Sequence, residues 1–270
     1  MCKEEIAEKE PLWKEIMGET LWTIDKEGTL TICPFKGTTA RLDAKTSGIW
    51  LLPKKKVLVK KVVVRNITAY GNLRRLFAGM TLCSTFDVSG LDVSHATDMS
   101  QMFFGCEALE DISTAAGWNV SCVERMNEMF SGCKAFKDLS PLAGWDVICV
   151  REMDGMFSEC PIETLDMLAS WNMSGIESVN CMFEKCVKLR DISGISGWYM
   201  GNVWYMCSMF KYCRALTDIS PIKDWDTHNA EMMSRIFYKS GVKDLSPLNW
   251  DTSIADDASE MLGPPLPFTP

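Results

Sequence analysis

Apolar residues recur along most of this chain with a period of 26 or 27 positions, which shortens to 25 in the last unit. Each repeated unit has a phenylalanine slot, filled by Phe77, Phe103, Phe130, Phe157, Phe183, Phe210, Phe237 and finally Leu262. A tryptophan slot keeps the same period, filled by Leu91, Trp118, Trp145, Trp171, Trp198, Trp225 and Trp250. Every tryptophan slot lies 12 residues before the next phenylalanine slot, whereas the reverse path varies between 13 and 15 residues. One half of the unit is therefore rigid and the other half tolerates insertions.

The rigid half has the spacing of a short helix. Its apolar positions in the second unit fall at i, i+3, i+6 and i+7, which predicts one helical face made of Val123, Met126, Met129 and Phe130. Ser121 and Glu124 have the capping-box form that satisfies free N–H groups where a helix begins. One inserted residue would turn the apolar face by about 100°, which explains the constant spacing.

The tolerant half predicts a brief strand followed by a corner. Its segments resemble "FKDLSPL" (residues 136–142), where Pro141 interrupts any longer strand. A unit of one strand and one short helix is typical of leucine-rich repeats. We therefore expect residues 76–262 to form an α/β repeat solenoid of about seven coils, a right-handed coil of short strands and short helices.

A single coil cannot be stable alone. Its aromatic and aliphatic side chains contribute about 8–12 kcal/mol of transfer free energy. Ordering the backbone costs about 1–2 kcal/mol for each residue, which is more in total. Stacking on neighbouring coils must supply the difference, so the same residue types recur in columns.

The segments flanking the repeats have other patterns. Residues 1–20 predict a charged helix with Ile6, Leu12, Trp13 and Ile16 on its apolar side, and residues 21–75 alternate as a β-rich cap. Residues 263–270 form a proline-rich segment that we expect to be disordered. Because a solenoid needs a cap at each end, an uncovered C-terminal coil would favour self-association through that coil.

Charge is unevenly distributed over the 270 residues. Residues 1–75 have a net charge of +6 and residues 76–270 a net charge of −14. The acidic part would repel nucleic acid and favours a neutral or basic protein partner. The chain contains no run of 18 apolar residues, and its charged beginning does not have the form of a signal peptide.

Five cysteines fill one column, at Cys106, Cys133, Cys160, Cys186 and Cys213. This column is typical of small buried thiols. Cys122 and Cys149 form a second column, for which we expect the same explanation. No Cys-x-x-Cys pair indicates zinc. Disulfides between coils would be compatible with strand spacing but not with helix packing.

A polar column predicts the candidate binding residues. It contains the aspartates Asp111, Asp138, Asp191, Asp218 and Asp244 and the serines Ser113, Ser140, Ser193, Ser220 and Ser246. The carboxylates have two interpretations, as a solvated face that caps the backbone or as an acidic strip that contacts a basic partner or a cation.

Catalytic and cofactor motifs are absent from the sequence. His95 and His228 occupy different repeat positions, so neither a metal pair nor a triad is indicated. We find no phosphate-binding loop, nucleophile elbow or zincin motif, and we expect no enzymatic activity, metal or cofactor.

Two segments carry a family resemblance. "WDVICVREMDGMFSEC" (residues 145–160) and "FKDLSPLAGWDV" (residues 136–147) resemble the BspA-like leucine-rich repeat family, also called DUF285. The resemblance implies a solenoid of the kind used on cell surfaces to bind other proteins. We therefore expect a non-enzymatic protein-binding module that uses its strand face and adjoining loops. The alternative is an intracellular structural or self-assembling scaffold.

Overall fold

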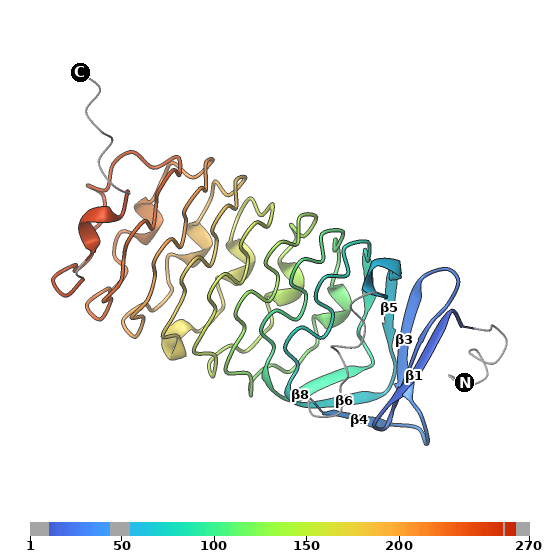
Figure 1. The fold of residues 1–270 in the computed structure, drawn as a ribbon. Helices are drawn as coiled ribbons and strands as arrows, with labels where there is room; N and C mark the ends of the chain where they lie inside the picture. Colours follow the sequence, from blue (N-terminus) through green and yellow to red (C-terminus); the bar gives the residue numbers. More distant parts are fainter. Residues whose placement is uncertain (1–10, 44–54, 256, 263–270) are drawn as a thin grey trace.

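The computed structural model describes residues 11–43, 55–255 and 257–262. Figure 1 shows a row of coils stacked side by side, with a group of strands at the N-terminal end. The expected tail at 263–270 and the first half of the expected helix at 1–20 lie outside the described residues.

The first sheet contains five strands in the order β1-β2-β3-β5-β7. Its strands are β1 (Trp13–Met17), β2 (Thr20–Ile24), β3 (Thr29–Pro34), β5 (Lys61–Val64) and β7 (Thr85–Asp87). The first three pair antiparallel, whereas β3, β5 and β7 pair parallel. The prediction of a helix over residues 1–20 is wrong for residues 13–17, which form the strand β1. Its side chains alternate in exposure and its backbone pairs with β2.

The second sheet has three parallel strands in the order β4-β6-β8. Its strands are β4 (Ala40–Asp43), β6 (Ile67–Asn72) and β8 (Leu91–Asp98). Both sheets extend past residue 75, because β7 and β8 add to strands of the β-rich segment. The N-terminal strands and the first coils therefore share their backbone hydrogen bonds.

The rigid half of each unit is a series of turns, and the helix expected at Val123–Phe130 is wrong. Glu128 has φ 54°, a left-handed conformation that interrupts a right-handed helix. Its N–H donates to the carbonyl oxygen of Asp154 in the next coil at 2.7 Å, and Phe130 N–H donates to Met156 at 2.9 Å. Because each coil finds its acceptors in the next coil, it does not need the internal hydrogen bonds of a helix.

The left-handed residues recur at two slots, two positions before and two after the phenylalanine. They are Arg75, Gln101, Glu128, Gly155, Cys181, Ser208 and Arg235 in the first slot, and Gly79, Gly105, Gly132, Glu159, Lys185, Tyr212 and Lys239 in the second. These two fixed bends, together with the hydrogen bonds between coils, explain why this half accepts no insertion.

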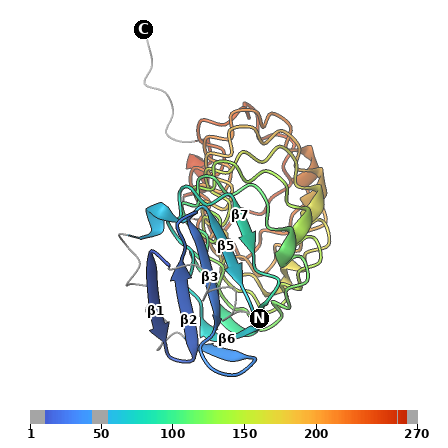
Figure 2. The same cartoon turned by 90° about the vertical axis from the view of Figure 1, so that its right-hand side faces the viewer.

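Short 3-10 helices occupy the tolerant half, where a strand and corner were expected. The helices that recur there are η3 (Ser113–Ala115), η4 (Ser140–Leu142), η5 (Asp166–Leu168), η7 (Ser193–Ile195) and η8 (Ser220–Ile222). The others are η2 (Lys56–Leu58), η6 (Met173–Gly175) and η9 (Ala258–Glu260). Strand character before them is limited to isolated bridges such as Thr164 to Asp191. The end-on view in Figure 2 shows the helices that recur in this half along one side of the coils.

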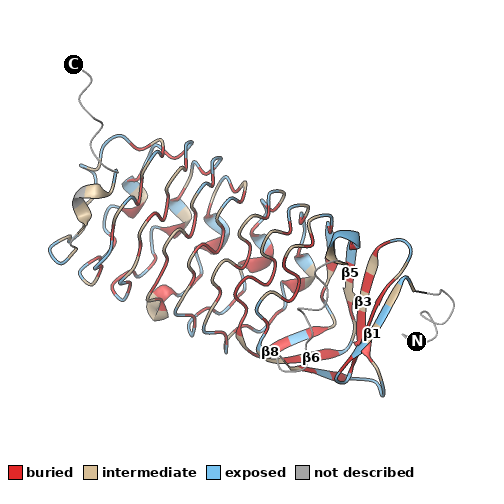
Figure 3. Cartoon of the chain, in the orientation of Figure 1, coloured by how far each residue is buried: buried red, intermediate tan, exposed pale blue. Residues whose placement is uncertain are grey.

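The core consists of columns of stacked side chains in the interior of the coils. Figure 3 marks the buried residues, which recur in every coil. Phenylalanine rings stack continuously from Phe77 to Phe237, with centroids 5.4–5.8 Å apart. Tryptophan rings stack in two runs, Trp118 on Trp145 and then Trp171 through Trp198 and Trp225 to Trp250. Residues one repeat apart therefore lie over each other, as the spacing predicts.

Candidate functional site

The main cysteine column is structural. Each of its five thiols is buried and donates to the phenylalanine carbonyl oxygen of the preceding coil, at 3.0–3.2 Å. Burial raises the pKa of Cys106 and Cys160 to about 12. These thiols stay protonated and inert at neutral pH. Cys122 and Cys149 are different, because both are exposed, and the expectation that they are buried is wrong.

The predicted aspartates cap the turns that follow them, which are 3-10 helices in all but the Asp244 coil. In each pair an aspartate oxygen accepts the backbone N–H of the serine two residues later, in Asp111–Ser113, Asp138–Ser140, Asp191–Ser193, Asp218–Ser220 and Asp244–Ser246, at 2.6–2.9 Å. This hydrogen bond holds the pKa of Asp191 and of Asp218 below the ordinary value. The capping interpretation therefore accounts for their spacing.

The charges of the strip still face solvent but are not continuous. Asp138 and Asp218 are exposed, and Asp191 is half-buried. Between Asp138 and Asp191 the slot is filled by Thr164, which bridges to Asp191. The structure thus divides the predicted strip into two groups of carboxylates.

A second exposed surface continues the sheet of β4, β6 and β8 along the coils. Its backbone ladder runs from Glu124 N–H to Thr97 oxygen at 2.9 Å, from Arg151 to Glu124 at 2.9 Å, and from Glu177 to Arg151 at 2.8 Å. Trp204 N–H then donates to Glu177 at 2.9 Å. We call the outward surface of this column the ladder face, made of Thr97, Glu124, Arg151, Glu177, Trp204 and Glu231.

The ladder face contains a depression of about 590 Å³. Its lining residues come from four neighbouring coils and are Glu124, Ile148, Cys149, Arg151, Ser174, Gly175, Glu177, Asn202 and Trp204. Gly175 occupies the slot that holds Cys149 and Asn202 in the adjoining coils. A Cβ atom there would lie 2.3 Å from the carbonyl oxygen of Ile148, so this coil requires glycine.

The depression combines charged and apolar groups. Arg151 forms an ion pair with Glu177 across two coils. Trp204 is 48% exposed and Ile148 is 43% exposed, although both are large apolar side chains. Tryptophan and arginine are enriched among the residues that contribute most to protein–protein binding. The arrangement can accept an extended chain that carries both an apolar and a charged side chain.

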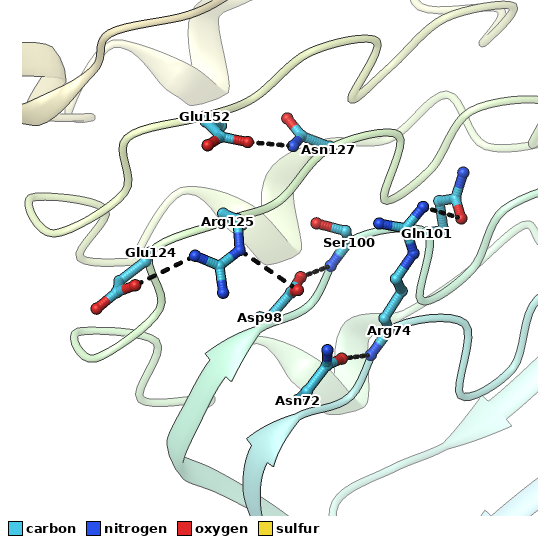
Figure 4. Close-up of polar contacts among 9 residues, drawn as sticks. All are labelled: Asn72, Arg74, Asp98, Ser100, Gln101, Glu124, Arg125, Asn127 and Glu152. Carbon is cyan, nitrogen blue, oxygen red and sulfur yellow. Dashed lines mark hydrogen bonds and ion pairs between the residues drawn. The ribbon is translucent and has the colours of Figure 1, made fainter. Parts of the chain in front are cut away.

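A polar network supports the N-terminal edge of the ladder face (Figure 4). The Arg125 guanidinium lies between two carboxylates, with Nε 3.4 Å from Asp98 Oδ2 and Nη1 3.3 Å from Glu124 Oε2. Two residues after Arg125, Asn127 Nδ2 donates to Glu152 Oε2 of the next coil at 2.6 Å. These contacts join adjacent coils and hold Glu124 at the rim of the depression.

Reasoning from the repeat missed this site. The signal that could have found it is Trp204, which stands outside the tryptophan slot and in a column otherwise filled by Thr97 and charged residues. Over the described ranges, no group of three or more His, Cys, Asp or Glu side chains could hold a metal ion. In the same ranges, no helix has the length and apolar character needed to cross a membrane.

Comparison with known proteins identifies the repeats. A family model described as "Mycoplasma protein of unknown function, DUF285" matches residues 71–164 and 162–268. No curated protein matches the chain. A leucine-rich repeat protein from Eubacterium ventriosum is similar at 14% identity over 84% of this chain and 94% of that one, with a TM-score of 0.29.

A leucine-rich cell surface protein from Faecalibacterium prausnitzii is similar at 12% identity, with a TM-score of 0.28. The similarity covers 77% of this chain and 54% of that protein. The family model, which covers well over half of the sequence, confirms the resemblance carried by the tryptophan and phenylalanine slots. This chain belongs to the DUF285 family.

Proposed function

We propose that this chain is a non-enzymatic protein-binding module, and that the depression on the ladder face receives an extended segment of a partner protein. The observation that carries the proposal is the exposure of Trp204, 48%, in a column of charged residues. A tryptophan buries about 150–250 Å² when fully covered, so covering its exposed half contributes roughly 2–3 kcal/mol. That contribution is available to a partner but not to folding.

The rigidity of the surface supports this proposal. The backbone of each ladder residue is hydrogen-bonded to the neighbouring coil, and the side chains project from a stack whose interior is one cluster of buried apolar residues. A preorganised surface loses little conformational entropy on binding. The segment from residue 76 onward has a net charge of −14, which favours a partner with basic residues beside Glu124 and Glu177.

In this proposal the acidic strip contributes to binding through its negative charge. Its carboxylates would attract a basic partner over a distance while they cap the turns. Changing Asp138, Asp191 and Asp218 together to Asn keeps the capping oxygen and removes the charge. If the strip takes part, this triple variant binds its partner more slowly and with a weaker dependence on salt.

Photo-crosslinking tests the ladder-face site directly. A photoreactive amino acid at position 204 should cross-link a partner, whereas the same group at Met167, which is 45% exposed on a 3-10 helix, should not. With the purified partner, Trp204→Ala should weaken binding at least about tenfold, or 1.4 kcal/mol. Equal cross-linking at both positions would contradict the proposal. Cross-links only between copies of this chain would favour the alternative, a self-assembling scaffold.

A further inference from the structure

The two exposed cysteines lie in matching positions of adjacent coils. Cys122 precedes Glu124 by two residues, and Cys149 precedes Arg151 by two residues. Arg151 N–H donates to the Glu124 carbonyl oxygen at 2.9 Å, which fixes the register of the two coils immediately after the cysteines.

The same register holds on the other side of the cysteines. Trp118 and Trp145 each lie four residues earlier, and their rings stack with centroids 6.1 Å apart. Cys122 and Cys149 lie in matching turns of the two coils, and with the register fixed on both sides we expect their backbones to be neighbours at about the 4.8 Å spacing of hydrogen-bonded strands. Disulfides join residues whose Cα atoms are about 4.4–6.8 Å apart.

From this geometry we infer that Cys122 and Cys149 form a disulfide site, in which a small-molecule disulfide oxidises the two thiols to a bond that joins adjacent coils. The adjoining coils have no cysteine at this repeat position, which is occupied by His95 in the coil before and by Gly175 in the coil after. Both thiols are exposed and free in the structure. The inference does not depend on the proposed binding function.

The reaction is a two-step exchange. The thiolate of one cysteine attacks a sulfur of the small-molecule disulfide, forms a mixed disulfide and releases one small thiol. The second cysteine then attacks the protein sulfur of that mixed disulfide, the new S–S bond forms, and the second small thiol leaves. The protein loses two protons and two electrons, which the small-molecule disulfide takes up as its two thiols.

Oxidised glutathione and peptide mapping test the site. The folded full chain, carrying Cys2→Ser because Cys2 lies outside the described residues, is oxidised and then digested without reduction. We expect a linked peptide containing Cys122 and Cys149, a mass lower by two hydrogen atoms, and two fewer titratable thiols. In Cys122→Ser the linked peptide should be absent, and Cys149 should carry a glutathione adduct instead.

A matched control moves one thiol along the same slot. Cys149→Ser combined with Asn202→Cys keeps two exposed thiols but separates them by three coils, so this variant should acquire two glutathione adducts and no internal bridge. Circular dichroism establishes that each variant is folded. The inference is overturned if the parent chain itself shows two separate adducts or only intermolecular bonds, or if the control variant bridges equally well.

Discussion

Replacing Phe157 with alanine tests the stacked core at the middle of the phenylalanine column. The ring is fully buried, and its centroid lies 5.8 Å from Phe130, 5.7 Å from Phe183 and 6.3 Å from Trp171. Phenylalanine-to-alanine changes in well-packed cores cost about 3–5 kcal/mol of unfolding free energy. Each ring pair contributes about 0.5–1.5 kcal/mol of that loss, so three pairs place Phe157→Ala at the upper end.

Urea denaturation followed by circular dichroism and tryptophan fluorescence measures this loss. Phe157→Leu fills most of the volume but loses the ring pairs, and it should cost about 1–3 kcal/mol. Phe237→Ala should cost less than Phe157→Ala, because Phe237 contacts two rings and not three. Met167→Ala, at an exposed position, should stay within about 0.5 kcal/mol. A loss below about 1 kcal/mol for Phe157→Ala would refute the idea that coils are held together by this column.

The remaining predictions concern the surface and the thiols. Trp204→Ala should weaken partner binding at least about tenfold while changing the unfolding free energy by under about 1 kcal/mol, since the side chain is half exposed; a large loss of stability would show that its role is structural. Asp191→Ala should cost about 0.5–2 kcal/mol because the turn loses its cap, whereas Asp191→Asn should be nearly neutral in urea denaturation. The pKa of Asp191 is lowered in the folded state, so its contribution to stability is present above about pH 4 and is lost as the pH falls through the folded pKa. The difference in unfolding free energy between the parent chain and Asp191→Ala should therefore become smaller in that acidic range. In a thiol titration at pH 8, Cys122 and Cys149 should react at once and Cys160 only after unfolding; early reaction of Cys160 would contradict its burial and its pKa of about 12.

The buried columns, which were predicted from the length of the repeat, agree with the structure. The phenylalanine, tryptophan and cysteine columns were predicted because a buried slot must be refilled by a similar side chain in every coil. The capping interpretation of Asp138 also came from the sequence, since an aspartate two residues before a serine can accept its N–H locally. Cys122 was assigned to the interior only by analogy with the main column, and that analogy failed because its slot faces solvent.

The sequence alone determined the repeat, its rigid and tolerant halves and the contents of its core, because these follow from local spacing and from the need to bury apolar residues. The tertiary structure decided that the rigid half is a set of turns and not a helix. Its hydrogen-bond acceptors, such as Asp154 for Glu128, lie a whole coil away and have no local signature. The sequence places Trp204, Arg151 and Glu177 at one repeat position, but only the structure shows that they line one exposed depression, because exposure depends on how the coils stack.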